Sequence, residues 1–361
     1  MFLDIDFEWY MHQNTFEVAD GSDVEPAAEA EVDADGTVTG DPASLTLAVF
    51  NVWNTNPPTW LYNSPYNRWM RYRQRMALLA EQLLEHSPDI IAFQEGRVDS
   101  SLGPPAGHSQ LRHLVDALPG YQYVWQPANV YFHQETFPSL DMEGCAVFSR
   151  HPIVHSDHVL LTRDADDQQD EHQRVVLHAV VKLPDGTLVD VYTTHLSLSQ
   201  PARDRTVIEL WDFVKASRRG HMQIVTGDMN AEPDTESIQF LQGLADMAGV
   251  RTSLTDAWLV LHEEPEPRST DERVRREALT FPSDNPVKRI DLVLLGTPDD
   301  AGVVSGTTNT APPCTPVVHD MFLIGQDPLP DVGRLTNDKG ENLGMVHKDS
   351  HLWSSDHRGL V

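Results

Sequence analysis

From residue 45 onward, short apolar runs alternate with stretches of helical spacing. A short apolar run bounded by turn residues predicts a strand, whereas leucines three and four positions apart predict an amphipathic helix. The predicted strands are 45–51, 89–95, 121–126, 144–149, 174–183, 187–195, 224–226 and 289–295. The predicted helices are 70–85, 109–118, 202–217 and 235–247. This mixture indicates an α/β fold, arranged as one large domain or two smaller ones.

Three stretches interrupt the pattern. Residues 1–44 form an N-terminal extension that is acidic and poor in large apolar side chains from residue 17, which predicts disorder or a linker. Residues 54–67 hold several prolines, tyrosines and tryptophans, and we expect an aromatic loop there. Residues 297–352 are rich in Pro and Gly with little periodicity, and we interpret them as a long insertion.

The candidate chemistry centres on the stretch Ile-Val-Thr-Gly-Asp-Met-Asn at residues 224–230. Gly227 ends a buried strand and permits a sharp turn without a Cβ clash. Asp228 and Asn230 are two residues apart, so they face the same way and suit a phosphate and its attacking water. The alternative interpretation is a strand followed by an ordinary Asx turn, because Asp and Asn are favoured where strands stop.

Charge narrows the class of function. The 361 residues carry 55 acidic and 26 basic side chains, a formal charge of -29. A field of that sign repels nucleic acid and anionic membranes unless a basic patch or divalent cations offset it, which argues against non-specific nucleic-acid packaging. The acidity fits either an adaptation to high salt or a solubility feature with an acidic arm.

The cysteines and the N-terminal residues bear on the kind of metal site and on the compartment of the protein. The two cysteines, Cys145 and Cys314, form neither a disulfide framework nor a thiolate metal site. The first ten residues contain three acidic and no basic residues, which is wrong for a secretory signal, and no stretch approaches about 18 apolar residues. We therefore expect a cytoplasmic protein without a transmembrane segment, and nothing in the sequence points to a protein partner.

Polar residues stand at the ends of the predicted strands. They are Asn51, Glu95, His195, Asp228, Asn230, Asp291, Asp356 and His357. In an α/β sandwich the loops at one edge would bring these groups together. Carboxylates such as Glu95 and Asp356 are hard oxygen ligands that suit Mg²⁺ or Mn²⁺, and no His or Cys pair has the spacing of a closed zinc site.

These residues stand in short motifs that follow one another along the chain. The motifs are Phe-Asn51-Val, Gln-Glu95, Glu143-Gly-Cys-Ala-Val-Phe-Ser-Arg150, Thr-His195-Leu, Gly-Asp228-Met-Asn230, Arg-Ile-Asp291 and Ser-Asp356-His357. Their order resembles that of the endonuclease/exonuclease/phosphatase superfamily over residues 45–361. The resemblance implies a catalytic domain built as a four-layered α/β sandwich, with two packed, mostly antiparallel sheets flanked by helices, and Mg²⁺-dependent cleavage of a phosphoester.

By matching position, the resemblance also implies roles. Glu95 is expected to be the principal Mg²⁺ ligand, with Asn51 and Asp356 beside it and with Mn²⁺ as a substitute cation. Asp228 and Asn230 would position the water and the phosphate.

The remaining implied roles belong to histidines and their partners. His357, oriented by Asp291, would act as a base or a phosphate-stabilising cation. His195 would face the phosphate from the other side, with Glu143 as the carboxylate behind it. Arg174 resembles a phosphate-contacting arginine, and the alternative is a surface arginine at a strand edge.

The motifs constrain the substrate less than they constrain the fold and the reaction. The stretch after Glu143 is similar to that of neutral sphingomyelinases and related small-phosphodiester hydrolases, which favours a lipid headgroup or another small phosphodiester. The alternatives are a nuclease of the same fold and, from another class, a catalytically silent binding module. The arginines 68, 71, 73 and 75 form either a solvated helix face or a grip for a headgroup or nucleotide. The histidines outside the motifs, such as His172 and His178, carry no motif context.

Overall fold

The computed structural model describes residues 44–53, 67–98, 109–133, 139–262, 271–296, 316–326, 335–336, 342–344 and 354–361. The predicted N-terminal extension up to residue 43, the aromatic loop at 54–66 and most of the insertion at 297–352 lie outside the described residues.

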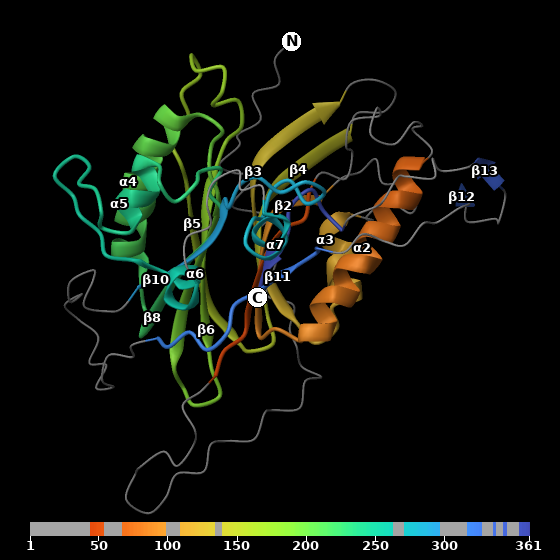
Figure 1. Ribbon diagram of the computed structural model, residues 1–361, viewed down its shortest axis with the longest axis horizontal. Helices are drawn as coiled ribbons and strands as arrows, with labels where there is room; N and C mark the ends of the chain where they lie inside the picture. The colour runs from red at the N-terminus through yellow and green to blue at the C-terminus, as the bar shows by residue number, and fades with distance from the viewer. Residues whose placement is uncertain are drawn as a thin grey trace, which may run out of the picture.

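Two mixed six-stranded sheets form the centre of the fold (Figure 1). The first sheet has the order β11-β14-β1-β2-β4-β3, with β1 at Leu47–Asn51, β2 at Ile90–Val98, β3 at Gln122–His133, β4 at Ser139–Ser149, β11 at Leu323–Ile324 and β14 at Gly359–Leu360. The second has the order β5-β6-β7-β8-β10-β9, with β5 at Ile153–Leu160, β6 at Val175–Lys182, β7 at Leu188–His195, β8 at Met222–Asp228, β9 at Thr255–Asp256 and β10 at Asp291–Gly296. The pairs in these sheets are antiparallel except β1–β2 and β7–β8. A separate pair joins β12, Leu335–Thr336, to β13, Asn342–Gly344.

Helices cover the outer faces of the two sheets (Figure 1). The described helices are α2 at Asn67–His86, α3 at Gln110–Ala117, α4 at Gln200–Ser217, α5 at Glu236–Leu241, α6 at Ala257–Leu261 and α7 at Glu272–Glu277. Helices α3 and α4 begin at serine N-caps, because Ser109 and Ser199 accept hydrogen bonds from backbone N–H groups of the first turn. None of the described helices is long and apolar enough to cross a membrane.

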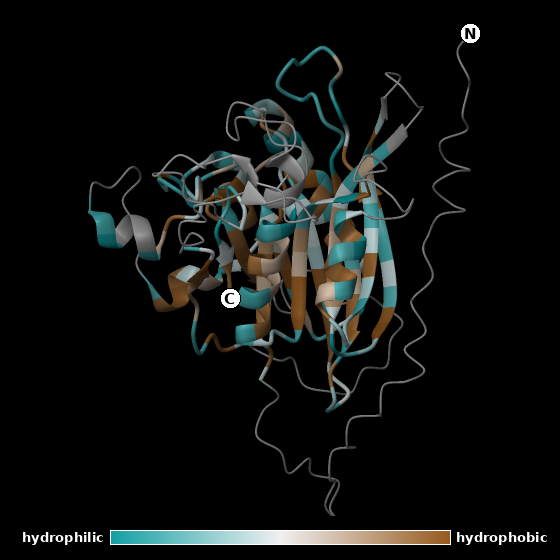
Figure 2. Ribbon diagram, turned by 90° about the vertical axis from the view of Figure 1, so that its right-hand side faces the viewer, coloured by the Kyte–Doolittle hydropathy of each residue, from teal (hydrophilic) through white to brown (hydrophobic). Residues whose placement is uncertain are grey.

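Three apolar clusters correspond to the three interfaces of a four-layered sandwich. The cluster between the sheets joins residues such as Val49 and Val147 of the first sheet to Val191 and Ile224 of the second. A second cluster lies between the first sheet and helices α2 and α3, and a third lies between the second sheet and helices α4 and α5. The hydropathy colouring shows the strands as mostly brown, apolar segments beneath helices with teal outer faces (Figure 2). The predicted α/β sandwich is confirmed.

Several element boundaries differ from the predicted ones. Strand β5 was not predicted because it is an edge strand with a single buried side chain and no apolar alternation. Strands β3 and β4 extend beyond the predicted apolar runs as a long antiparallel pair. The helix predicted at 235–247 ends at Leu241, since Gly243 follows at φ +70 and donates its N–H to Phe240.

The predicted insertion contributes to the sheet. Its segment Leu323–Ile324 forms β11 and pairs with β14, so β14 lies between β11 and β1. The short strand that follows His357 is therefore paired on both sides, and the turn that carries His357 is anchored in the sheet.

Candidate active site

Gly227 shapes the turn at the centre of the site. It adopts φ +133, and an added Cβ would lie 2.0 Å from the carbonyl oxygen of Thr194 on the neighbouring strand β7. Only glycine fits that close approach without a shift of the backbone. Asp228 therefore leaves the strand end directly opposite His195, which is its partner in the β7–β8 register.

The carboxylate of Asp228 is a hub of contacts. Its Oδ2 accepts a hydrogen bond from Nδ2 of Asn51 at 3.0 Å and lies 3.4 Å from Nε2 of both His195 and His357. Its Oδ1 accepts the backbone N–H of Asn230 at 2.8 Å. The turn thus has the geometry of an Asx turn while the second carboxylate oxygen faces the site. Burial raises the pKa of Asp228 to about 6, with repulsion from Asp291 adding to the rise.

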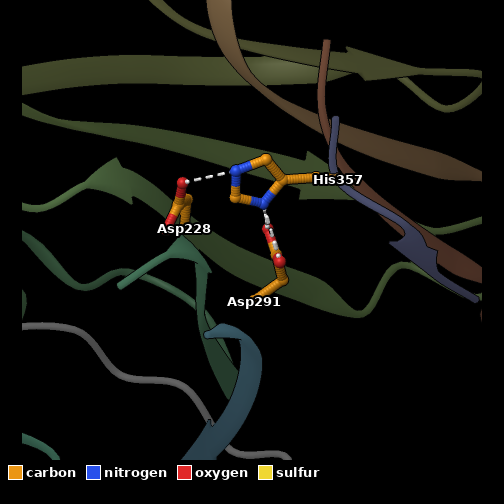
Figure 3. A group of neighbouring side chains, drawn as sticks. All are labelled: Asp228, Asp291 and His357. Carbon is orange, nitrogen blue, oxygen red and sulfur yellow. Dashed lines mark hydrogen bonds and ion pairs between the residues drawn. The ribbon is translucent and has the colours of Figure 1, made fainter. Parts of the chain in front are cut away.

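His357 lies between two carboxylates. Its Nδ1 contacts Asp291 at 3.0 and 3.2 Å, and its Nε2 faces Asp228 (Figure 3). Burial lowers the pKa of His357, but Asp291 and Asp228 outweigh this effect and hold the pKa well above its usual value. The imidazole is therefore a buried cation in a fixed orientation. The ring of Phe281 packs on it at a centroid distance of 4.6 Å.

The turn that carries Asp356 and His357 is held by serines. Ser355 Oγ donates to the carbonyl oxygen of Asn51 at 2.6 Å, which joins the turn to the end of β1. Ser283 donates its hydroxyl to the carbonyl oxygen of Ser355 at 2.6 Å and its N–H to that of Asp356 at 2.8 Å. Phe281 and Ser283 stand outside the motifs, so the sequence patterns did not single them out.

Glu95 lies at a bulge in β2. The pairing of β2 with β4 shifts register between Phe93 and Gly96, and Glu95 adopts φ +59 there. Its Oε1 accepts a hydrogen bond from Asn51 Nδ2 at 3.0 Å. Burial raises the pKa of Glu95 to about 8, and repulsion from Glu143 and Asp356 adds to it. Burial also raises the pKa of Asp356, against the charges of His357 and Arg75.

The donor set fits a hard divalent cation. Glu95 and Asp356 are carboxylates that repel each other, and a bound cation would remove the repulsion. Asp228, Asp291 and His357 also have ligand-type atoms within 4.8 Å of one another, but hydrogen bonds and ion pairs already join these groups. The donor set fits the predicted roles of Glu95 and Asp356 as metal ligands, which stay predictions.

Asn51 is oriented by its neighbours. Its Nδ2 faces Glu95 and Asp228, and its Oδ1 accepts the backbone N–H of Trp53 at 3.0 Å. In this arrangement the amide nitrogen, not the oxygen, faces the two carboxylates. The predicted role of Asn51 as a metal ligand would require the amide to rotate, and it stays a prediction.

A small pocket opens beside Glu95 and His195. Its lining includes Asn129, Glu143, Gln173 and Arg174. Arg174 is only 7% exposed, and its Nε is buried with no hydrogen-bond partner among the described residues. A buried guanidinium without a carboxylate partner is expensive unless an anion binds it. The structure therefore disfavours the surface interpretation of Arg174.

His195 and Glu143 flank the same pocket from opposite sheets. Burial lowers the pKa of His195 well below its usual value, and the charges of Arg174 and His357 add to this, so the imidazole is neutral. The carboxylate that contacts His195 is Asp228, whereas Glu143 forms an ion pair with Arg97 at 2.8 Å. The described residues show no contact between Glu143 and His195, so the predicted placement of Glu143 behind His195 is not seen among them.

The environment of Arg75 differs from both predictions for the arginine cluster, a solvated helix face and a grip for a headgroup or nucleotide. It is 1% exposed, its guanidinium stacks on the Trp53 ring at 4.6 Å, and its charge lowers the pKa of Asp356. The spacing could have revealed this, because Arg75 lies three residues after Tyr72 and four before Leu79, on the buried stripe of α2. Arg73 is exposed, and the side chains of Arg68 and Arg71 lie outside the described part.

Comparisons with known proteins agree with this fold. The family model described as "Endonuclease/Exonuclease/phosphatase family" matches residues 48–357. No curated protein matches the sequence.

Similar solved structures share the fold at low identity. A mannosyl-6-phosphatase from Bacteroides thetaiotaomicron is 18% identical with a TM-score of 0.54, and the match covers 88% of this chain and 98% of that one. An endonuclease/exonuclease/phosphatase family protein from the same organism is 18% identical with a TM-score of 0.55, and the match covers 89% of this chain and 97% of that one. D. rerio TDP2, in complex with a single-strand DNA product, is 18% identical with a TM-score of 0.51, and the match covers 88% of this chain and 96% of that one.

Proposed function

The chain belongs to the endonuclease/exonuclease/phosphatase family, and on that premise we propose that it is a Mg²⁺-dependent phosphodiesterase that acts on a lipid headgroup or another small phosphodiester. Members of this family are hydrolases of phosphoester bonds, and the finer assignment rests on the site of this chain.

The main support for the proposal is the burial of the Arg174 side chain in the wall of the pocket. Its guanidinium lines the pocket beside Glu95 and His195, it is 93% buried, and its Nε lacks a hydrogen-bond partner among the described residues. A phosphate oxygen in the pocket would satisfy this cation, because guanidinium and phosphate match in charge and geometry. Phosphate bound there would lie next to Glu95, the proposed principal metal ligand.

A divalent cation on Glu95 and Asp356 would polarise the phosphate and activate water. The protein side chains supply the remaining functions. Asp228 has a pKa of about 6, so its carboxylate is ionised at neutral pH and suits a proton acceptor for the attacking water. Water adds to phosphorus, the bond to the alcohol oxygen breaks, and the alcohol leaves with the balancing proton.

His357 and Asn230 complete the arrangement. His357, protonated between Asp228 and Asp291, supplies positive charge close to the proton acceptor and offsets the charge of the pentacoordinate phosphorus. Asn230 donates its side-chain amide to the carbonyl oxygen of Leu196 at 2.9 Å, which ties the loop after His195 to the Asp228 turn. We propose that this bond fixes the distance between the two sides of the phosphate site.

The test is hydrolysis by purified protein, with Mg²⁺, Mn²⁺ or chelator, of sphingomyelin, phosphoinositides, a chromogenic diester, a sugar phosphate monoester, and single- and double-stranded DNA and RNA. We expect turnover of lipid or small diester, lost with chelator and reduced at least tenfold in Arg174→Met. Arg112→Gln is the control, since Arg112 is exposed and its ion pair among the described residues is with Asp116 on α3.

Other outcomes have distinct meanings. Cleavage of nucleic acid alone would establish the nuclease alternative, and cleavage of the monoester alone would make the protein a phosphatase. Inactivity on the whole panel, in folded and metal-loaded protein, would contradict hydrolysis and favour a binding module.

A further inference from the structure

A ledge of polar aromatic and basic side chains stands beside the pocket, formed by Arg97, Tyr131 and His172. Arg97 lies on β2 with its guanidinium 5.2 Å from the centre of the Tyr131 ring on β3. The Tyr131 hydroxyl lies 3.4 Å from Nδ1 of His172, and the two rings are nearly perpendicular at a centroid distance of 6.4 Å. Three segments distant in sequence therefore meet here.

The ledge adjoins the pocket on two sides. Arg97 donates to Glu143, which lines the pocket, and His172 directly precedes the pocket residues Gln173 and Arg174. Asn129 and Gln173 exchange two hydrogen bonds of 3.0 and 2.8 Å. This exchange fixes the segment that carries His172 against β3, so the ledge and the pocket are held together.

Two nitrogen atoms of the ledge, Arg97 Nη1 and His172 Nε2, carry N–H groups without a partner among the described residues. Arg97 directs both Nε and Nη2 to the same oxygen of Glu143, which leaves Nη1 without a hydrogen-bond partner among the described residues. Burial raises the pKa of Tyr131 to about 12, so its hydroxyl keeps its proton and can donate to His172 Nδ1. Burial lowers the pKa of His172, and the neutral ring then carries its own N–H on Nε2, which has no partner among the same residues.

We propose that Arg97 and His172, spaced by Tyr131, form a second anion-binding subsite, which takes a phosphate or carboxylate group on one arm of the phosphodiester. The proposal rests on the proposed function, since it specifies the substrate class for the same pocket. A guanidinium N–H and a neutral imidazole N–H donate to an anionic oxygen more strongly than to a neutral one. In a chain with only 26 basic residues against 55 acidic ones, two such donor groups next to a phosphate pocket suit a substrate that carries a second negative charge.

The test uses three 4-nitrophenyl diesters whose second arm is an ethyl group ending in hydroxyl, carboxylate or phosphate. We expect the wild type to favour the charged arms over the hydroxyl arm by about tenfold or more in kcat/KM, mainly through KM. The ratio between the carboxylate and phosphate arms identifies which anion the subsite prefers.

Three variants separate the subsite from general effects. Arg97→Lys keeps a cation for Glu143 but lacks the guanidinium Nη1, and His172→Gln removes the ring N–H; both should bring the preference close to one. Tyr131→Phe keeps the ring beneath Arg97 and loses the hydroxyl that orients His172, so it should lower the preference partly. Arg112→Gln removes one surface charge and should keep the wild-type ratio.

Equal kcat/KM for the three diesters in the wild type would overturn the subsite while leaving the proposed function intact. Failure to cleave any of them would contradict the proposed function instead. In that case, calorimetry still tests the subsite by comparing the binding of methylenebisphosphonate with that of methylphosphonate. The subsite requires the wild type to bind the bisphosphonate more tightly, and His172→Gln should remove this difference in affinity.

Discussion

Nδ1 of His357 lies 3.0 Å from one carboxylate oxygen of Asp291 and 3.2 Å from the other, although the two residues are 66 positions apart. Asp291 begins β10, and His357 stands in the turn before β14. The contact therefore joins the two sheets, and it fixes both the charge and the orientation of the imidazole.

Asp291→Asn should lower kcat by about a hundredfold or more, because a neutral amide no longer holds His357 protonated or selects its tautomer. Metal affinity should stay within a few-fold of the wild-type value, since Asp291 is not among the proposed metal ligands. Steady-state kinetics and a metal titration by calorimetry give the two numbers. A variant with unchanged kcat would show that the charge of His357 does not contribute to turnover.

Arg75→Met should destabilise the metal-free protein by about 2–4 kcal/mol, because it removes a buried cation from Asp356 and from the face of Trp53. Saturating Mg²⁺ should recover part of this loss, since a bound cation neutralises Asp356. Urea unfolding with Mg²⁺ and with chelator measures both effects. Arg73→Met, at an exposed position of the same helix, is the control, and equal losses in the two variants would contradict a specific role for Arg75.

The positions of Asn51, His195 and Asp228 could be predicted because each ends an apolar run of strand length. Asn51 and His195 end β1 and β7, and Asp228 ends β8, as the pattern indicates. Their gathering at one edge follows from the parallel pairs β1–β2 and β7–β8, which place successive strand ends side by side.

Contacts that depend on register could not be predicted in the same way. Arg97 faces Glu143 because β2 and β4 pair after a bulge, and no local pattern reveals a shift of one residue between two strands. The support from Phe281 and Ser283 depends on an irregular loop that packs behind the His357 turn. Such loops carry no periodicity, so tertiary structure alone places them.

Gly227→Ala should destabilise the protein by about 4 kcal/mol or prevent folding, since the new Cβ would collide with a buried carbonyl oxygen at 2.0 Å. Gly186→Ala is a matched control, because Gly186 has φ +88 and open space around its Cβ position. There the cost should be only the conformational strain of about 1–2 kcal/mol. Chemical denaturation measures both values, and similar losses would mean that φ, not the close approach of β7, makes glycine necessary at 227.

Metal-free protein should lose stability as the pH rises from about 5 to 8. The folded pKa of Glu95 is raised from 4.5 to about 8, so its favourable contribution is complete below the unfolded pKa and is lost as the pH rises through the folded value. The raised pKa of Asp356 acts in the same direction. Thermal unfolding in chelator across this range should show a falling Tm, and Mg²⁺ should suppress the fall because it neutralises both carboxylates.

Glu95→Gln should flatten the curve of Tm against pH in chelator, whereas Glu81→Gln on the exposed face of α2 should not. A falling Tm that is the same in Glu95→Gln and in the wild type would place the electrostatic strain elsewhere than at the proposed metal ligand.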